Sequence, residues 1–365
     1  MAITILNQPQ PINPTYNDTY ISFSSDLVGN NQAKIKIQGF EFSIIPNLQG
    51  VYHFNLKEIV KGLFESSFQD GDFLPSIGYK ISDLTLFKTF DFEVSVYNDE
   101  GDEENIQVEY SFNKSVKQFG EDVFQNDVQL LNHTLNGYDY NLTYFEGYPF
   151  DITVQNLNDN SGDLTFKNKN SNQVSEAISI DNGTTRIYLD KGVDNWSITG
   201  FLNIPDLLNK LELYVDDSFK VNLNLKKVTS KCGVYLKWFN KDGSYSYRLF
   251  DEFFKDETSA NSLDEVGVNS FQNINSNSTG NLKILGKEGA RELQLKTRVN
   301  QTEVYQIKDI ITSPQVQMYS SNKPFTGGKW LNVTVSTRGI NISNKKASNE
   351  VAITVVLPQL NTQTL

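Results

Sequence analysis

Residues 233–250, with the sequence GVYLKWFNKDGSYSYRLF, constrain the fold of this chain more than any other segment. Large side chains alternate with a period of two, so that Val234, Leu236 and Trp238 share one face of an extended strand. Residues 240–243 have turn-forming chemistry, and the same period returns at Tyr245, Tyr247 and Leu249. The pattern predicts a β-hairpin in which Trp238 is buried, because an exposed tryptophan on this face would leave a large apolar patch.

The composition extends this prediction to the whole chain. Hydrophobic residues make up 38% and aromatic residues 12% of the sequence, which is enough for packed cores. Phe, Tyr, Val, Ile and Leu carry this content rather than Ala and Met, and Asn, Ser, Thr and Gly lie between them, which favours strands and turns. We therefore expect an all-β (mainly β) protein of antiparallel β-sandwiches with one or two short accessory helices.

The chain length predicts more than one domain. Single hydrophobic cores stop growing at about 250 to 300 residues, and this chain has 365. We expect an N-terminal β domain at residues 1–115, a middle β-sandwich at residues 116–226 and a C-terminal β domain at residues 227–365.

In the N-terminal domain, strands are predicted at residues 20–24 and 33–44, with a β-bulge at Gly39 where the alternation changes phase. A short helix is predicted at residues 55–64, because Asn55 is a good N-cap and five apolar residues follow at helical spacing: Leu56, Ile59, Val60, Leu63 and Phe64. Residues 91–97 and 106–112 read as a hairpin joined by an acidic loop. The helix should pack its apolar stripe on a sheet of this domain.

The middle domain reads as a meander of short strands separated by turn sequences, at a spacing typical of a sandwich. A one-turn helix is predicted at residues 206–211, after Pro205. The predicted strands lie at residues 138–145, 150–155, 163–167, 185–189, 196–202, 211–215 and 219–225.

The C-terminal domain begins with the hairpin and contains a long loop at residues 256–281, rich in Ser, Asn, Asp and Gly. Loops of this length are uncommon in compact domains unless they have a function, so two interpretations stay open: a floppy insertion, or an arm that orders against a neighbouring subunit. The termini, residues 1–19 and 358–365, are also too poor in apolar residues to order alone. An amphipathic segment is predicted at residues 303–312, and strands at residues 316–319, 330–335 and 349–357.

No catalytic, cofactor-binding or metal-binding residue is predicted, and we expect a protein that is not an enzyme. The two histidines, His53 and His133, stand alone, and the single cysteine, Cys232, is expected to be a small buried residue. Residues 286–289 lack the phosphate-binding pattern. Two alternatives stay open: calcium at the acidic loop 98–105 or, more weakly, at Asp70 and Asp72, and a pair of carboxylates that hydrolyses glycosides.

The formal net charge of −12 argues against nucleic-acid binding, because the sequence has no stripe of Lys and Arg. The first residues lack a secretory pattern, and no run approaches the roughly 18 apolar residues of a membrane span. We therefore expect synthesis in the cytoplasm, without a membrane span.

The hairpin also resembles a known family. A Leu236-Lys-Trp238 strand, a turn with Asn and Gly, and a return strand of the form Tyr-x-Tyr-x-x-Phe are similar to a segment of virion structural proteins from short-tailed crAss-like phages of Bacteroidetes. The order of elements in residues 303–365 and the opening, where three prolines lead into residues 20–26, resemble the ends of such proteins. Together these segments cover about half of the chain.

This resemblance implies a non-enzymatic structural component of a tailed-phage virion, assembled in the host cytoplasm. Such a protein forms a homo-oligomeric ring or collar in the tail or neck, and its partners are copies of itself and other tail or neck proteins. One alternative is a receptor-binding or glycan-binding tail protein in which Trp196, Trp238 or Trp330 stacks on sugars. A polysaccharide depolymerase ranks behind it.

Overall fold

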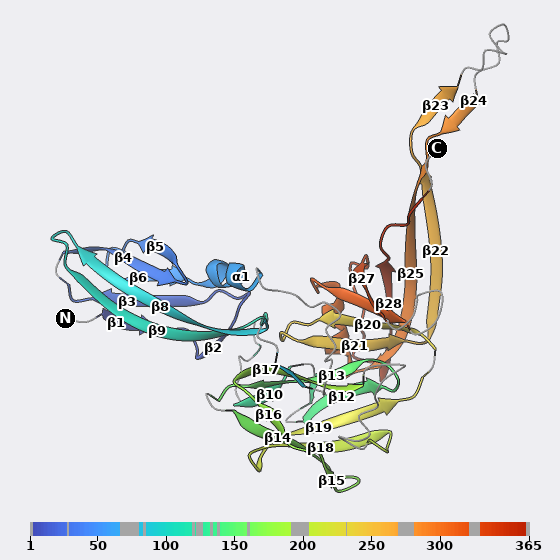
Figure 1. The fold of residues 1–365 in the computed structure, drawn as a ribbon, viewed down its shortest axis with the longest axis horizontal. Helices are drawn as coiled ribbons and strands as arrows, with labels where there is room; N and C mark the ends of the chain where they lie inside the picture. Colours follow the sequence, from blue (N-terminus) through green and yellow to red (C-terminus); the bar gives the residue numbers. More distant parts are fainter. Residues whose placement is uncertain are drawn as a thin grey trace.

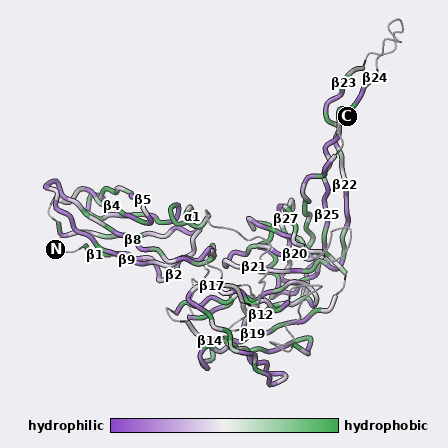
Figure 2. Tube along the Cα trace, in the orientation of Figure 1, coloured by the Kyte–Doolittle hydropathy of each residue, from purple (hydrophilic) through white to green (hydrophobic). Residues whose placement is uncertain are grey.

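The computed structural model confirms the predicted fold class: the chain is mainly β, with strands β1 to β28 and two short helices in the part that the structure describes (Figure 1). Hydrophobic and hydrophilic residues alternate along many of the strands (Figure 2). The described residues are 3–27, 29–65, 80–82, 85–118, 121, 127–131, 134–136, 139–158, 161–190, 204–230, 232–268, 281–320 and 329–362.

The N-terminal domain is a sandwich of two sheets whose apolar residues meet in one core. The smaller sheet has the order β1 (Ile3–Asn7), β3 (Tyr20–Ser25), β6 (Tyr52–Asn55). The larger sheet has the order β2 (Ile12–Pro14), β9 (Glu103–Asn113), β8 (Phe87–Asn98), β4 (Asn30–Ile37), β5 (Phe40–Ile44).

The predicted helix is present as α1 (Lys57–Glu65), and the side-chain oxygen of Asn55 accepts a hydrogen bond from the Lys57 N–H at 3.1 Å. Leu56, Val60 and Phe64 are fully buried in the core between the sheets. The apolar stripe therefore packs as predicted.

Two expectations for this domain are wrong. Gly39 is not a bulge: Gln38 and Gly39 have φ angles of 44° and 85°, the left-handed conformations of a two-residue hairpin turn, and they separate β4 from β5. Residues 3–19 are not a free arm either. β1 pairs with β3 and β2 pairs in parallel with β9, so the backbone hydrogen bonds of the sheets order this segment.

The middle of the chain forms a second sandwich with its own core. One sheet has the order β10 (Val128–Leu130), β13 (Phe150–Asn156), β17 (Gly183–Asp190), β7 (Lys80–Ser82). The other has the order β11 (Thr134–Asn136), β12 (Asp139–Phe145), β19 (Ser218–Val228), β18 (Leu208–Val215), β14 (Gly162–Asn168), β15 (Gln173–Val174), and β16 (Ile178–Ile180) also pairs with β14.

The one-turn helix predicted at residues 206–211 is wrong. Leu211, Leu213 and Val215 alternate with exposed or half-buried residues, and this period places residues from Leu208 onward in β18, paired with β19. The sandwich is not purely antiparallel, because β12 and β19 run parallel. The strand predicted at residues 196–202 lies outside the described residues.

The C-terminal sheet has the order β21 (Tyr245–Phe250), β20 (Val234–Phe239), β26 (Val316–Ser320), β27 (Lys329–Val335), β28 (Ser348–Val356), β25 (Lys287–Asn300), β22 (Phe253–Ser262). The predicted amphipathic segment is α2 (Val304–Lys308) followed by the 3-10 turn η3 (Asp309–Ile311). Val304, Ile307 and Ile310 turn into the core of this sheet.

The predicted hairpin is confirmed as β20 and β21, and all of their residues are buried. Leu236 and Trp238 lie in the C-terminal core, whereas Tyr235 and Tyr247 lie in the middle core. Trp238 is 1% exposed, so the prediction of its burial is correct. The hairpin is therefore a wall shared by two cores.

Three hydrophobic cores thus organise the described residues. They do not follow the chain strictly, since β7 lies before residue 115 in sequence but pairs with β17 of the middle sheet. The predicted boundaries at residues 115 and 226 stay predictions.

Candidate interaction arm and interdomain junction

The most distinctive surface feature is a two-stranded ribbon that projects from the body of the protein (Figure 1). β22 and β25 pair antiparallel from Phe253 opposite Lys296 to Ser262 opposite Lys287. β23 (Glu265–Val268) and β24 (Asn281–Ile284) continue the ribbon outward. All ten residues of β22 are exposed. The predicted loop at residues 256–281 is therefore wrong for its described part, and residues 269–280 lie outside that part.

Cross-strand pairing explains why a polar sequence forms this ribbon. At its base, β25 also pairs with β28, which anchors Leu293 and Leu295 in the C-terminal core. The chain after β28 then follows β25 outward, where Leu360 N–H donates to the Gly289 carbonyl at 3.4 Å. Residues 357–360 are consequently held by the chain itself and are not a free arm.

Several charged side chains in or beside the ribbon form ion pairs. Asp256 forms an ion pair with Arg291, and Arg298 approaches Glu252 at 3.1 Å. The neighbouring guanidinium of Arg291 lowers the pKa of the Asp256 carboxyl through a hydrogen bond. Surface pairs of this kind contribute little to stability in water. They therefore help to set the register of β22 and β25 but add little to the rigidity of the ribbon.

The outer part of the described ribbon, from the ends of β22 and β25 through β23 and β24, exposes apolar side chains, which we call the ribbon tip: Leu263, Val266, Ile284 and Leu285. These side chains are 36% to 44% exposed. An isolated two-stranded hairpin is marginally stable in water, and apolar side chains on it gain stability only when another surface covers them. The ribbon tip has the properties of an interaction surface.

A second exposed apolar surface lies on the N-terminal domain, at the outer strand of its larger sheet. β5 is at the end of the strand order, so among the described residues one of its backbone edges has no hydrogen-bonded partner strand. Phe40 at the start of β5, and Ile45 and Leu48 in the segment that follows it, are strongly exposed, at 52%, 79% and 108%. We call these three residues, together with the free edge of β5, the β5 edge surface.

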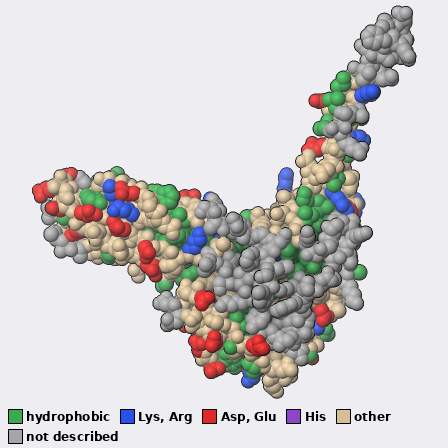
Figure 3. Space-filling model, viewed as in Figure 1, with side chains coloured by type: hydrophobic (Ala, Val, Ile, Leu, Met, Phe, Trp, Pro, Cys, Tyr) green, Lys and Arg blue, Asp and Glu red, His purple; other side chains and the backbone are tan. Residues whose placement is uncertain are grey.

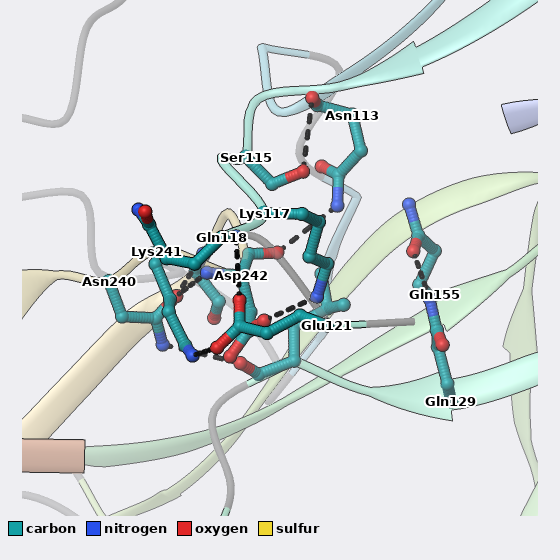
Figure 4. A network of polar contacts seen from close by, with 12 residues as sticks. Asn113, Ser115, Lys117, Gln118, Glu121, Gln129, Gln155, Asn240, Lys241 and Asp242 are labelled. Atoms are coloured by element: carbon teal, nitrogen blue, oxygen red, sulfur yellow. Dashed lines mark hydrogen bonds and ion pairs between the residues drawn. The ribbon is translucent and has the colours of Figure 1, made fainter. Parts of the chain in front are cut away.

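The N-terminal domain meets the rest of the protein at a polar junction (Figure 4). Val116 N–H donates to the Lys241 carbonyl at 2.8 Å, and the Asn113 amide donates to the Asp242 carbonyl at 3.1 Å. Lys117 Nζ lies 2.6 Å from the Asp242 carboxylate, and Lys241 forms an ion pair with Glu121. The turn of the β20–β21 hairpin therefore holds the segment that leaves the N-terminal domain.

Gly243 is required for this fit. Its φ is +85°, and a Cβ at this position would lie 2.8 Å from both the Asn113 side-chain oxygen and the Lys114 carbonyl oxygen. An alanine there would combine backbone strain with a clash.

A cavity of about 320 Å³ lies in the same junction, between Tyr16, residues 114–116, residues 239–241, Asp309 and residues 312–314. Burial raises the pKa of the Asp309 carboxyl to about 7, with further increases from the charges of Asp242 and Glu121 and an opposing decrease from Lys241. The junction thus contains an acid that titrates near neutral pH.

A buried ion pair ties the middle sheet to the hairpin. Arg186 donates to one Asp151 oxygen from Nε at 2.8 Å and from Nη2 at 2.6 Å, and the Tyr247 hydroxyl donates to the same oxygen at 2.8 Å. The guanidinium also lies 4.4 Å from the centre of the Tyr245 ring. Both charged groups are at most 2% exposed, so the arrangement is structural and gives no access to a substrate.

Among the histidines and the cysteine singled out from the sequence, the structure describes His53 and Cys232, and it places them in different segments. His53 is exposed on β6 and bonds to the Ser22 hydroxyl at 2.8 Å. Cys232 is exposed, in a bend before β20 begins, so the expectation that it is buried is wrong. His133, Asp70, Asp72 and Trp196 lie outside the described residues.

The acidic loop is a tight turn. The Asn98 side-chain oxygen accepts hydrogen bonds from the Glu100 N–H at 3.1 Å and the Asp102 N–H at 2.8 Å. Among the described residues, no three His, Cys, Asp or Glu side chains gather closely enough to hold a metal ion. Calcium binding there stays a hypothesis.

Trp238 and Trp330, the described tryptophans among those considered for sugar stacking, contact other residues of the protein. Trp238 is buried, which excludes it from such a role. Trp330 is half-buried: its ring lies 5.2 Å from that of Tyr319, and Lys237 Nζ lies 4.5 Å from its centre. These contacts serve the shared wall between two cores.

Comparisons with known proteins add only distant likenesses. No protein-family model matches the chain, and no curated protein sequence matches it. The solved structures include the periplasmic chaperone SfaE, with 9% identity, a TM-score of 0.21, and 63% of this chain and 100% of that chain covered. Another is a bacterial ice-binding adhesin, with 8% identity, a TM-score of 0.20, and 98% and 97% covered.

A third is SGBP-B of the Bacteroides ovatus mixed-linkage glucan utilization locus in complex with a mixed-linkage heptasaccharide, with 9% identity, a TM-score of 0.18, and 98% of this chain and 99% of that chain covered. At such TM-scores these likenesses carry no argument about what this chain does.

The sheets of this chain themselves establish a multi-domain protein of β-sandwich type. Among the described residues, no helix is long and apolar enough to cross a membrane.

Proposed function

We propose that this chain is a non-enzymatic structural subunit of a tailed-phage virion, which assembles with copies of itself into a ring or collar of the tail or neck. The observation that carries this proposal is the projecting ribbon with its apolar tip. A strand pair that leaves the body without a covering layer gains little within one chain, and it gains stability when a neighbouring subunit covers it.

Two further features support a structural role. The hairpin β20–β21 is buried on both faces between two cores, and the Tyr247 hydroxyl binds it to Asp151 of the Asp151–Arg186 pair in the middle domain. The body is thus a rigid block from which the arm extends. Rigid blocks with projecting arms suit assemblies of repeated subunits.

The purified chain tests this proposal by mass photometry and electron microscopy across a range of concentrations. We expect closed oligomers. The matched variant replaces residues 263–286 by Asn-Gly: Ser262 and Lys287 lie directly opposite one another, so a two-residue turn can join them without changing the register.

This variant should unfold at the same temperature as the natural chain but remain monomeric. Oligomers that persist without residues 263–286 would show that the ribbon is not the assembly arm. A natural chain that stays monomeric at every concentration and is absent from phage particles contradicts the structural proposal itself.

A further inference from the structure

We infer that the ribbon tip of one copy docks on the β5 edge surface of the next copy, which makes the contact head-to-tail. This inference rests on the proposed function and specifies the partner of the ribbon. Four observations lead to it, and each concerns residues that the structure describes.

The first observation is that the two surfaces are matched in kind. The ribbon tip offers four apolar side chains on a narrow strand pair, and the β5 edge surface offers three in β5 and in the segment that follows it. A free sheet edge binds an incoming strand through backbone hydrogen bonds, and flanking apolar side chains add specificity. The β5 edge surface therefore offers a free strand edge, and the ribbon tip offers strands that can pair with it.

The second observation is their separation. The N-terminal domain and the ribbon extend from the body in different directions, and their far ends lie at opposite sides of the molecule (Figure 1). The ribbon tip cannot reach β5 of its own chain in this arrangement. Contact between the two surfaces has to join different copies, and a contact between two different patches propagates into a ring or a filament.

The third observation is charge. Residues 1–118 hold 16 acidic and 8 basic residues, whereas residues 253–268 and 281–300 together hold 6 of each. Acidic side chains are spread over the visible face of the N-terminal domain in Figure 3. Two N-terminal domains would repel one another, but a neutral ribbon meets no such penalty, so charge favours the ribbon as the partner.

The fourth observation is that β5 contains no proline and no register shift in its pairing with β4. Natural edge strands are often guarded by inward-pointing charges, prolines or bulges. Within β5, Glu41 is the charged residue, and Lys34 of the neighbouring strand pairs with it at 2.6 Å, which lowers the pKa of this carboxyl through a hydrogen bond. The edge therefore presents Phe40 beside an already neutralised charge.

Cross-linking between singly substituted chains tests the inference. The exposed native thiol is first removed by Cys232→Ser. Chains carrying Leu48→Cys are mixed with chains of different mass carrying Leu285→Cys, and a short bismaleimide is added under conditions where mass photometry shows oligomers. We expect a cross-linked pair that contains one chain of each kind.

The matched control is Leu207→Cys, a leucine that is 75% exposed on the middle of the chain. Mixed with Leu285→Cys chains, it should give no cross-linked pair. Equal yields with Leu207→Cys and Leu48→Cys would overturn the inference, because the reaction would then reflect exposure alone.

Two further outcomes separate the inference from the proposed function. Oligomers that cross-link only through Leu285 to Leu285, or not at all, would refute docking on β5 while leaving a self-assembling subunit intact. No oligomers and no chain in phage particles would refute both.

A second variant, Leu48→Asp, should weaken association about tenfold or more without lowering the unfolding temperature, whereas Leu207→Asp should change neither.

Discussion

Trp238 and Phe239 are neighbours on β20, yet their side chains lie in different hydrophobic cores. The alternation of a strand turns successive side chains to opposite faces of the sheet, and here both faces are covered. We therefore expect a substitution in the hairpin to disturb both cores.

Replacing Trp238 by alanine should lower the free energy of unfolding by about 3 to 5 kcal/mol, because it empties a large space in the C-terminal core. Trp238→Phe should cost clearly less, since the indole N–H has no hydrogen-bond partner among the described residues. Denaturant unfolding measures both. An alanine variant as stable as the natural chain would contradict the shared-wall interpretation.

Gly243→Ala should weaken the junction. The residue has φ +85°, and the new Cβ would meet the Asn113 side chain and the Lys114 carbonyl. The matched control is Gly101→Ala, where φ is +92° and no atom lies within 4 Å of the added carbon, so it carries the backbone strain of about 1 kcal/mol without the clash.

Limited proteolysis around residues 113–118 and small-angle scattering check this prediction. The Gly243 variant should be cut faster in this segment and should show a wider range of shapes than the Gly101 variant. Equal behaviour of the two variants would mean that the close approach at Gly243 does not hold the junction.

Local patterns predicted the elements that depend on neighbours in sequence. The hairpin and α1 were foreseen because periods of 2 and 3.6 place their apolar residues on defined faces. The strand β25 carried a similar signal, with Leu293, Leu295 and Val299 in alternation, and it could have located the ribbon. Its partner β22 carried none, because a polar sequence becomes a strand only through pairing.

Features that join distant residues could not be predicted. The parallel pairing of β12 with β19 connects segments far apart in the chain. Asp151 and Arg186 are 35 positions apart, and nothing local to either residue indicates that the other neutralises it. The β5 edge surface likewise depends on which strand ends the sheet, and that order follows from tertiary packing.

The buried ion pair leads to a graded prediction. Arg186→Met leaves the Asp151 carboxylate buried without its cation and should cost about 3 to 5 kcal/mol of unfolding free energy. Tyr247→Phe removes one hydrogen bond to the same oxygen and should cost about 1 to 2 kcal/mol. Thermal unfolding of both variants measures this order. A Tyr247→Phe loss as large as that of Arg186→Met would mean that packing, and not the charge, dominates at this site.

The last prediction concerns pH at the junction. Burial raises the pKa of Asp309 from 3.8 to about 7, so the folded protein holds a proton on this carboxyl over a range of pH in which the unfolded chain has lost it. Between about pH 4 and 7 the folded state binds more protons than the unfolded state, and the contribution of Asp309 to stability therefore falls as the pH rises.

Asp309→Asn keeps an oxygen that can accept a hydrogen bond but removes the titration. Relative to the natural chain, it should be more stable at pH 8, on the order of 2 kcal/mol after allowance for the partial access of water to this carboxyl. The difference should vanish near pH 4, where the natural side chain is protonated in the folded state. Unfolding curves of both chains from pH 4 to pH 8 measure it. A difference that is constant over this range, or that has the opposite sign, would show that the Asp309 carboxyl is not held in its neutral form by the junction.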